Sequence, residues 1–148
     1  MPSSIGKEGP IRVLLVDDHA LFRQIIRVSL SQYPDIEVVG EAANGLQAVE
    51  QADILLPDVI LMDVHMTKMD GITATRSIKT RHPKMVFIGL SIDAINHRAA
   101  ILEAGAVTVL WKESVVETLH SAIHSALAAD GKPPTLGRNS CGSASSQS

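Results

Sequence analysis

Apolar residues recur along the chain in two alternating patterns: short runs, and longer stretches with one apolar residue every three or four positions. Runs of roughly four to eight apolar residues bounded by turn signals are typical of strands that are buried in a sheet. The stretches between them have the spacing of one helix face. The predicted strands are 11–16, 36–42, 58–62, 85–90 and 107–111, and the predicted helices are 19–32, 45–56, 72–81, 93–104 and 113–129.

Turn and capping residues bound several of these helices. Pro34 ends the first helix, because the residue before a proline is displaced from helical geometry. Asn44 is a good N-cap for the second helix, and Gly105 is a typical C-terminal stop for the fourth. Apolar stripes predicted to run along the first, fourth and last helices are Leu21, Phe22, Ile25, Ile26 and Leu30; Ile95, Ala99 and Leu102; and Val116, Leu119, Ile123, Ala126 and Leu127.

Strict alternation of strand and helix predicts an α/β fold with a parallel sheet that is covered on both faces, since parallel neighbours need crossover connections. We expect a flavodoxin-like doubly wound five-stranded parallel sheet in the order 2-1-3-4-5, with five helices. Periodicity alone does not separate this order from a longer Rossmann order, but the pattern stops after five units. The predicted organisation is a flexible N-terminal lead (1–10), one domain (11–130) and a flexible tail or the start of a linker (131–148).

Composition narrows the classes of function. A formal charge of −3 argues against a nucleic-acid surface, which needs a basic patch. The N-terminal segment has no apolar run typical of a signal peptide, and no segment has the roughly 20 apolar residues of a membrane span. With a single cysteine the chain cannot form an internal disulfide, so a cytoplasmic location is expected.

Charged residues follow the predicted strands where each one ends. Strand 1 is followed by Asp17 and Asp18, strand 3 by Asp63, strand 4 by Ser91 and strand 5 by Lys112. In the order 2-1-3-4-5 the ligand crevice lies beyond the carboxyl ends of strands 1 and 3. The sequence therefore predicts one pocket that holds all five side chains.

Three carboxylates in one pocket repel each other unless a cation lies among them, and Mg²⁺ suits an all-oxygen site. A hydroxyl and an ammonium beside such a cluster predict a site for a transferred phosphoryl group. A carboxylate would attack in line, Ser91 would hydrogen-bond one phosphoryl oxygen, and Lys112 would neutralise others.

Four segments of the chain carry a family resemblance. They are Val-Leu-Leu-Val-Asp-Asp-His-Ala-Leu-Phe-Arg (13–23), Pro-Asp-Val-Ile-Leu-Met-Asp-Val (57–64), Met-Asp-Gly-Ile (69–72) and Leu-Trp-Lys-Glu (110–113). These segments resemble the receiver domains of two-component response regulators, and the first is most similar to the NarL/FixJ-like branch. The resemblance covers 11 to about 129.

The resemblance implies a role for each residue of the predicted pocket. A sensor histidine kinase or a phosphotransfer protein phosphorylates Asp63, and Ser91 and Lys112 contact the phosphoryl group. Asp17, Asp18, Asp63 and the backbone carbonyl of His65 hold Mg²⁺. The chain is then no enzyme, but a phosphoacceptor that assists its own phosphorylation and dephosphorylation. Phosphorylation repositions helix 4 and remodels the face made by helix 4, strand 5 and helix 5; a homodimer is left open.

Four positions depart from the family pattern, one of which is Glu113 in place of the common proline after the lysine. Thr67 stands where a proline is usual, Val109 replaces an aromatic switch residue, and Ile92 is bulky where many receivers have a small residue. These last three departures favour an alternative, a receiver-like protein-interaction module whose signalling is degenerate or independent of phosphorylation. A nucleotide or flavin carrier is disfavoured, because the first strand–helix turn lacks a glycine-rich phosphate loop.

Simpler interpretations of single residues stay open. Each aspartate, taken alone, could be an ordinary cap at the end of a strand. His19 and His65 could suggest a transition-metal site, but no third nitrogen or sulfur ligand has suitable spacing, and solvated or capping histidines are the simpler interpretation.

Overall fold

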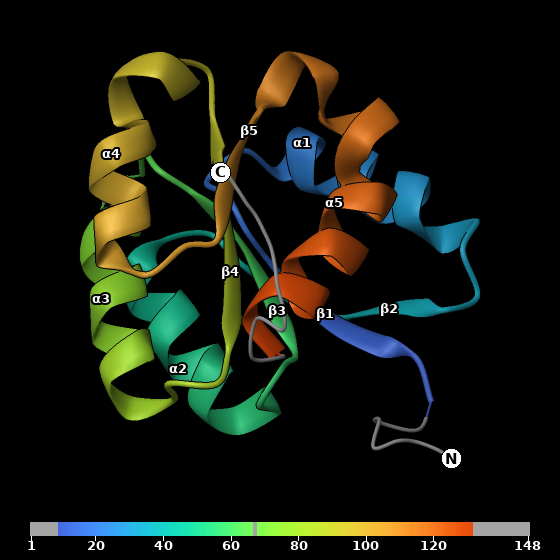
Figure 1. The fold of residues 1–148 in the computed structure, drawn as a ribbon, viewed down its shortest axis with the longest axis horizontal. Helices are drawn as coiled ribbons and strands as arrows, with labels where there is room; N and C mark the ends of the chain where they lie inside the picture. Colours follow the sequence, from blue (N-terminus) through green and yellow to red (C-terminus); the bar gives the residue numbers. More distant parts are fainter. Residues whose placement is uncertain (1–8, 67, 132–148) are drawn as a thin grey trace, which may run out of the picture.

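The computed structural model describes residues 9–66 and 68–131, in which five strands alternate with five α-helices (Figure 1). The strands are β1 (Ile11–Val16), β2 (Ile36–Ala42), β3 (Val59–Asp63), β4 (Val86–Ser91) and β5 (Thr108–Trp111). The helices are α1 (Ala20–Ser31), α2 (Gly45–Leu55), α3 (Gly71–Arg81), α4 (Ala94–Ala104) and α5 (Val115–Gly131), and a short 3₁₀ turn, η1 (Lys112–Ser114), precedes α5. Each predicted strand and helix is present, with ends that differ from the prediction by at most two residues.

The five strands form one parallel sheet in the order β2-β1-β3-β4-β5. Helices α1 and α5 cover one face, while α2, α3 and α4 cover the other (Figure 1). The predicted flavodoxin-like fold and strand order are confirmed.

Aliphatic side chains fill a core layer on each side of the sheet. Every residue of β3 and β4 is buried, as expected of central strands in a doubly covered sheet. One layer joins the sheet to α1 and α5 through Ile26, Leu30, Leu119 and Ile123. The other joins it to the small and apolar residues of α2, α3 and α4.

Local sequence sets the start of three helices. The side chain of Asn44 accepts a hydrogen bond from the backbone N–H of Gln47 at 2.9 Å, and Asp70 and Asp93 cap α3 and α4 in the same way. Gly71 begins α3 directly against the backbone carbonyl of Asp63, where any Cβ would collide with that oxygen. The start of α3 therefore packs against the end of β3.

Five positions of the predicted helix stripes are wrong, because the side chains are exposed: Leu21, Ile25, Ile95, Ala99 and Val116. Val116 is 45% exposed, whereas its neighbour Val115 is buried on the same face of α5 as Leu119. Ile95 is 77% exposed because α4 meets the sheet through Ala94, Ile101 and Ala104. Leu21 is 70% exposed, since α1 buries the Ile26–Leu30 side.

The predicted N-terminal lead and C-terminal tail lie almost entirely outside the described residues, as does Thr67. Among the residues that the structure describes, no helix is both long and apolar enough to cross a membrane.

Candidate functional site

The register of the sheet brings the predicted pocket residues to one edge. Val16 of β1 pairs with Met62 of β3, so Asp17 and Asp63 follow at the same level. Farther along the sheet, Ser91 of β4 pairs with Trp111 of β5, and Lys112 comes next. The carboxyl ends of four neighbouring strands thus supply one site.

Lys112 lies between the two buried aspartates of this site. Its Nζ atom is 2.6 Å from Oδ2 of Asp17 and 3.1 Å from Oδ1 of Asp63. Both carboxylates are almost fully buried, at 2% and 3% exposure. Nζ also lies 4.8 Å from the centre of the Phe22 ring, a contact that holds the ammonium over an aromatic face.

Burial and charge displace the pKa of two of these groups in ways that fit a reactive site. Burial, together with the charge of Asp17, raises the pKa of Asp63 to about 6, against the opposing effect of Lys112. For Lys112, burial alone would lower the pKa, but the hydrogen bond to Asp17 and the charge of Asp63 outweigh it and raise the pKa. Lys112 is therefore an ammonium at neutral pH, and a cation near Asp63 would favour its ionised form.

One oxygen of Asp63 is left for a ligand. Oδ1 accepts a hydrogen bond from the backbone N–H of His65 at 3.3 Å and faces Lys112. Oδ2 is buried, with no hydrogen-bond partner among the described residues. A buried carboxylate oxygen without a partner is costly unless an ion or a reacting group satisfies it.

Asp18 and His19 stand at the outer side of the cluster. The Nδ1 atom of His19 is 2.9 Å from Oδ1 of Asp18 and 3.2 Å from Oδ1 of Asp17. The side chain of Asp18 is 25% exposed, compared with 3% for Asp17, so Asp18 is the more accessible of the pair. Oxygens of Asp17, Asp18 and Asp63 and a nitrogen of His19 lie within 4.8 Å of one another, close enough to share a metal ion.

Ser91 is buried and held on the α4 side of the pocket. Its Oγ accepts a hydrogen bond from the backbone N–H of Asp93 at 2.9 Å and lies 2.8 Å from Nδ1 of His97. The imidazole of His97 also meets that of His65, with 2.8 Å between their Nε2 atoms. Ser91 therefore lies at the same end of the sheet as Lys112, but its hydroxyl is hydrogen-bonded to Asp93 and His97 at the start of α4.

The donor set fits Mg²⁺ by its chemistry. Three carboxylates converge, and the partnerless Oδ2 of Asp63 is one of the oxygens present. Mg²⁺ takes oxygen ligands and keeps several waters, so a few protein oxygens suffice. The side chain of His65 is turned toward His97 and away from the cluster, and its backbone carbonyl stays a predicted ligand.

Comparison with known families decides the classification. The family model described as the response regulator receiver domain matches residues 13–124. The chain belongs to this family. Receiver domains accept a phosphoryl group in two-component signalling and bind Mg²⁺ at an acidic pocket, and the acidic cluster of this receiver domain lies at the corresponding sheet edge.

Curated relatives include both enzymes and transcription regulators. The receiver is 52% identical over 98 residues to a protein-glutamate methylesterase/protein-glutamine glutaminase of Alkalilimnicola ehrlichii, covering 65% of this chain and 25% of that protein. It is 43% identical over 118 residues to the transcriptional regulatory protein LiaR of Bacillus subtilis, covering 78% of this chain and 56% of that one. The chain thus spans between a quarter and just over half of these relatives.

Among solved structures, the signal receiver domain of the putative response regulator NarL from Mycobacterium tuberculosis superposes with a TM-score of 0.76 at 31% identity. The match covers 84% of this chain and 99% of that one. Together with LiaR, it supports the NarL-type resemblance of the first strand and helix.

Two contacts of this region were not predicted from the sequence. His97 lies six residues after Ser91 and carries no motif, yet it contacts both Ser91 and His65. Phe22 was predicted on a helix stripe but lies beneath Lys112. Only the packing of α4 and α1 against the strand ends creates these contacts.

Proposed function

We propose that Asp63 of this receiver accepts a phosphoryl group from a sensor histidine kinase or a phosphotransfer protein. The observation that carries the proposal is the buried, partnerless Oδ2 of Asp63 beside an ion-paired Oδ1. Of the two buried aspartates, Asp17 has one oxygen bonded to the backbone N–H of His19 and the other facing Lys112. Asp63 is therefore the better placed nucleophile.

In the proposed step, Oδ2 of Asp63 attacks phosphorus in line with the donor's phosphohistidine nitrogen. A P–O bond forms, the P–N bond breaks, and the leaving imidazole nitrogen takes a proton. Lys112 holds Oδ1 and compensates the negative charge of the transferred group, and Ser91 hydrogen-bonds a phosphoryl oxygen once it turns from His97. Little covalent chemistry beyond this positioning is needed.

Mg²⁺ is the proposed cofactor, held by Asp17, Asp18, Asp63 and the backbone carbonyl of His65. When bound it supplies positive charge that lowers the repulsion between these carboxylates and the incoming phosphoryl oxygens. The chain's own residues then fix where the ion lies. The same arrangement lets the receiver assist its own dephosphorylation, since a water in line with the acyl phosphate meets the same charges.

The proposed output is a change of the face formed by α4, β5 and α5. Ser91 is bonded to Asp93 at the start of α4 and to His97 in its first turn, so a turn of Ser91 toward phosphate breaks the His97 contact and frees that helix to move. The partners proposed are the kinase or phosphotransfer protein, and a second copy of the chain. Exposed apolar residues of α1 beside Val116 of α5 give such a homodimer one candidate surface. A cytoplasmic location is proposed with the kinase partner.

A second candidate function is a protein-interaction module that does not depend on phosphorylation. Val109 favours it, because this side chain is 7% exposed and packs in the core where the family has a mobile aromatic residue. Ile92, in contrast, is 70% exposed and projects from the rim. Beryllofluoride that leaves self-association and partner binding unchanged would favour this second function.

The primary proposal is tested with acetyl phosphate and Mg²⁺ by intact-mass analysis. The wild-type chain is expected to gain one phosphate, EDTA to prevent the gain, and Asp63→Asn to abolish it. Asp58→Asn is the matched control, because Asp58 lies at the opposite end of β3 and bonds the backbone N–H of Arg12. Equal phosphorylation of wild type and Asp63→Asn would overturn the assignment.

A further inference from the structure

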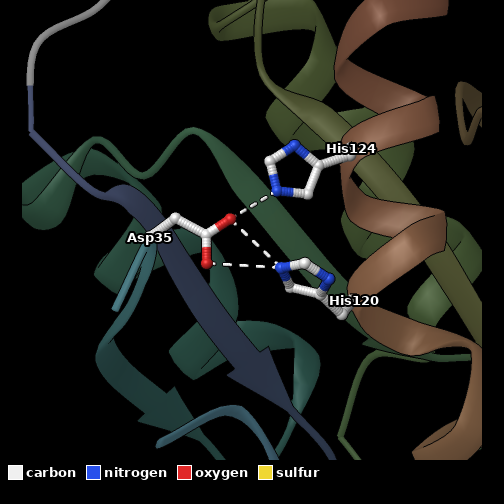
Figure 2. A group of neighbouring side chains, drawn as sticks. All are labelled: Asp35, His120 and His124. Atoms are coloured by element: carbon white, nitrogen blue, oxygen red, sulfur yellow. Dashed lines mark hydrogen bonds and ion pairs between the residues drawn. The ribbon is translucent and has the colours of Figure 1, made fainter. Parts of the chain in front are cut away.

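A second cluster of titratable side chains lies at the other end of the sheet. Asp35 belongs to the turn between α1 and β2, while His120 and His124 project from α5 toward it (Figure 2). This turn precedes β2, so it stands at the amino ends of the strands, whereas Asp63 follows their carboxyl ends. The phosphoryl chemistry proposed above makes no use of these three residues.

The three side chains converge on one carboxylate oxygen. Oδ2 of Asp35 is 2.6 Å from Nε2 of His124 and 3.1 Å from Nε2 of His120, and Oδ1 is 3.3 Å from the latter (Figure 2). His120 and His124 are four residues apart on α5, so their rings occupy adjacent turns of one helix face. All three ligand atoms lie within 4.8 Å of one another.

We propose that Asp35, His120 and His124 form a transition-metal site that is distinct from the phosphoacceptor pocket. Zn²⁺ is the ion with which the site is tested. Two imidazole nitrogens and one carboxylate oxygen are a donor set that Zn²⁺, Ni²⁺ and Cu²⁺ favour and that Mg²⁺ and Ca²⁺ do not. Water fills the fourth position, since three protein ligands leave a tetrahedral site open.

The spacing of the donor atoms is close to what the metal needs. Zn–N and Zn–O bonds of about 2.0–2.1 Å place tetrahedral ligands roughly 3.3 Å apart. The separation of 3.1 Å between His120 and Asp35 nearly meets this value. The contact of 2.6 Å between Nε2 of His124 and Oδ2 of Asp35 must open by roughly 0.7 Å, and both side chains are about half exposed and able to turn.

The backbone and a neighbouring ring hold two of the three ligands before any ion arrives. The Tyr33 ring stacks on the His120 imidazole, with 3.9 Å between centroids and 13° between planes. The carbonyl of Asp35 accepts a hydrogen bond from the N–H of Ile11 at 2.8 Å, which ties the turn to β1. Such preorganisation reduces the entropy lost when the ligands are fixed.

Proton movement accompanies binding in a defined way. In the free site each Nε2 faces a carboxylate and carries the proton that it donates. A neutral imidazole must shift this proton to Nδ1 so that its Nε2 lone pair can bind the ion, and an imidazolium must release one proton. Metal binding thus replaces two N–H···O contacts by bonds to the ion.

The bound ion would join α5 to the turn between α1 and β2. Helix α5 is part of the face proposed to change on phosphorylation, so an ion here would restrain the helix from its far end. A ligand that binds only the folded chain also raises its melting temperature, by about 5–10 °C when the free ion is about 100-fold above its dissociation constant.

The test titrates Zn²⁺ into the full 148-residue chain by calorimetry and follows ¹⁵N-labelled imidazoles by NMR. We expect this site to bind Zn²⁺ with a dissociation constant on the order of 1–100 µM, weaker than four-ligand structural sites. His124→Ala and His120→Ala should each weaken that site by at least tenfold. His82→Ala should not weaken it, although His82 pairs with Asp53 at 2.7 Å, because no second histidine ligand joins that pair in the part of the chain that the structure describes.

The acidic pocket contains His19 and could take a second Zn²⁺, so the imidazole signals assign each site. Zn²⁺-dependent shifts of the Nε2 signals of His120 and His124, lost in His124→Ala, support the proposal. His124→Ala removes an exposed side chain, and circular dichroism confirms that the variant is folded. Unmoved signals of these two histidines up to about 1 mM Zn²⁺, or undiminished binding by the His124→Ala variant, would overturn it.

Discussion

Nδ1 of His97 lies 2.8 Å from the hydroxyl oxygen of Ser91, so the side chain proposed to contact phosphate is bonded to α4. When Nδ1 of His97 is unprotonated, Ser91 donates its one hydroxyl proton to it, and that proton is not available to a phosphoryl oxygen. His97 also contacts His65, so the competition between His97 and a phosphoryl oxygen for Ser91 takes place next to the β3–α3 loop. We infer that His97 favours the unphosphorylated arrangement.

His97→Ala should therefore increase the affinity of the receiver for beryllofluoride in the presence of Mg²⁺. A net contribution of about 1 kcal/mol for one hydrogen bond corresponds to roughly a fivefold gain. Fluorescence of Trp111 or calorimetry measures the affinity, and Arg98→Ala, an exposed change on the same helix, is the control. A lower affinity in His97→Ala would mean that His97 supports the activated arrangement instead.

The pKa of Asp63 predicts how stability changes with pH in the absence of Mg²⁺. Burial and the charge of Asp17 raise this pKa to about 6, above the value of about 3.9 in the unfolded chain. The folded chain binds this proton more tightly, so the contribution of Asp63 to stability is fully present below about pH 4 and is lost as pH rises through about 6. The loss from this one group is about 3 kcal/mol.

Asp63→Asn removes that ionisation and should stabilise the Mg²⁺-free protein at pH 8 by about 2–3 kcal/mol, with little effect near pH 4. Urea unfolding in EDTA at both pH values gives the free energies. Glu117→Gln, at an exposed position of α5, serves as the control. A difference between wild type and variant that does not grow with pH would contradict the raised pKa.

Lys112→Met should destabilise the Mg²⁺-free protein, because it leaves Asp17 and Asp63 buried without their cation. Breaking such a buried pair costs about 3 kcal/mol. The cost should shrink toward pH 5, where Asp63 takes a proton. Urea unfolding at pH 5 and pH 8 measures this cost, and Lys84→Met, at an exposed position, is the control. An equal loss of unfolding free energy at both pH values would argue for lost packing instead of lost charge.

Much of the fold and the phosphoacceptor pocket could be predicted because both depend on strands. Asp17 and Asp63 directly follow buried apolar runs, and parallel strands necessarily align their carboxyl ends. The strand order then places Ser91 and Lys112 at the same edge without any knowledge of side-chain rotamers.

Contacts that depend on how helices rotate and dock could not be predicted in this way. Val115 is buried in place of Val116, and apolar spacing does not decide between them, because both lie three or four residues before Leu119. The spacing of His120 and His124 gives a shared helix face, but Asp35 joins them only because α5 docks over the turn before β2. Likewise, His97 meets Ser91 only through the orientation of α4.

The most direct measurement of the central claim locates the phosphoryl group on the chain. Borohydride reduces an aspartyl phosphate to homoserine, so peptide mapping after treatment with acetyl phosphate and Mg²⁺ reads out the modified position. We predict homoserine at position 63, and none at Asp17 or Asp18. Homoserine at either of those two positions, or an unmodified residue 63 in a chain that has gained phosphate, would contradict the account.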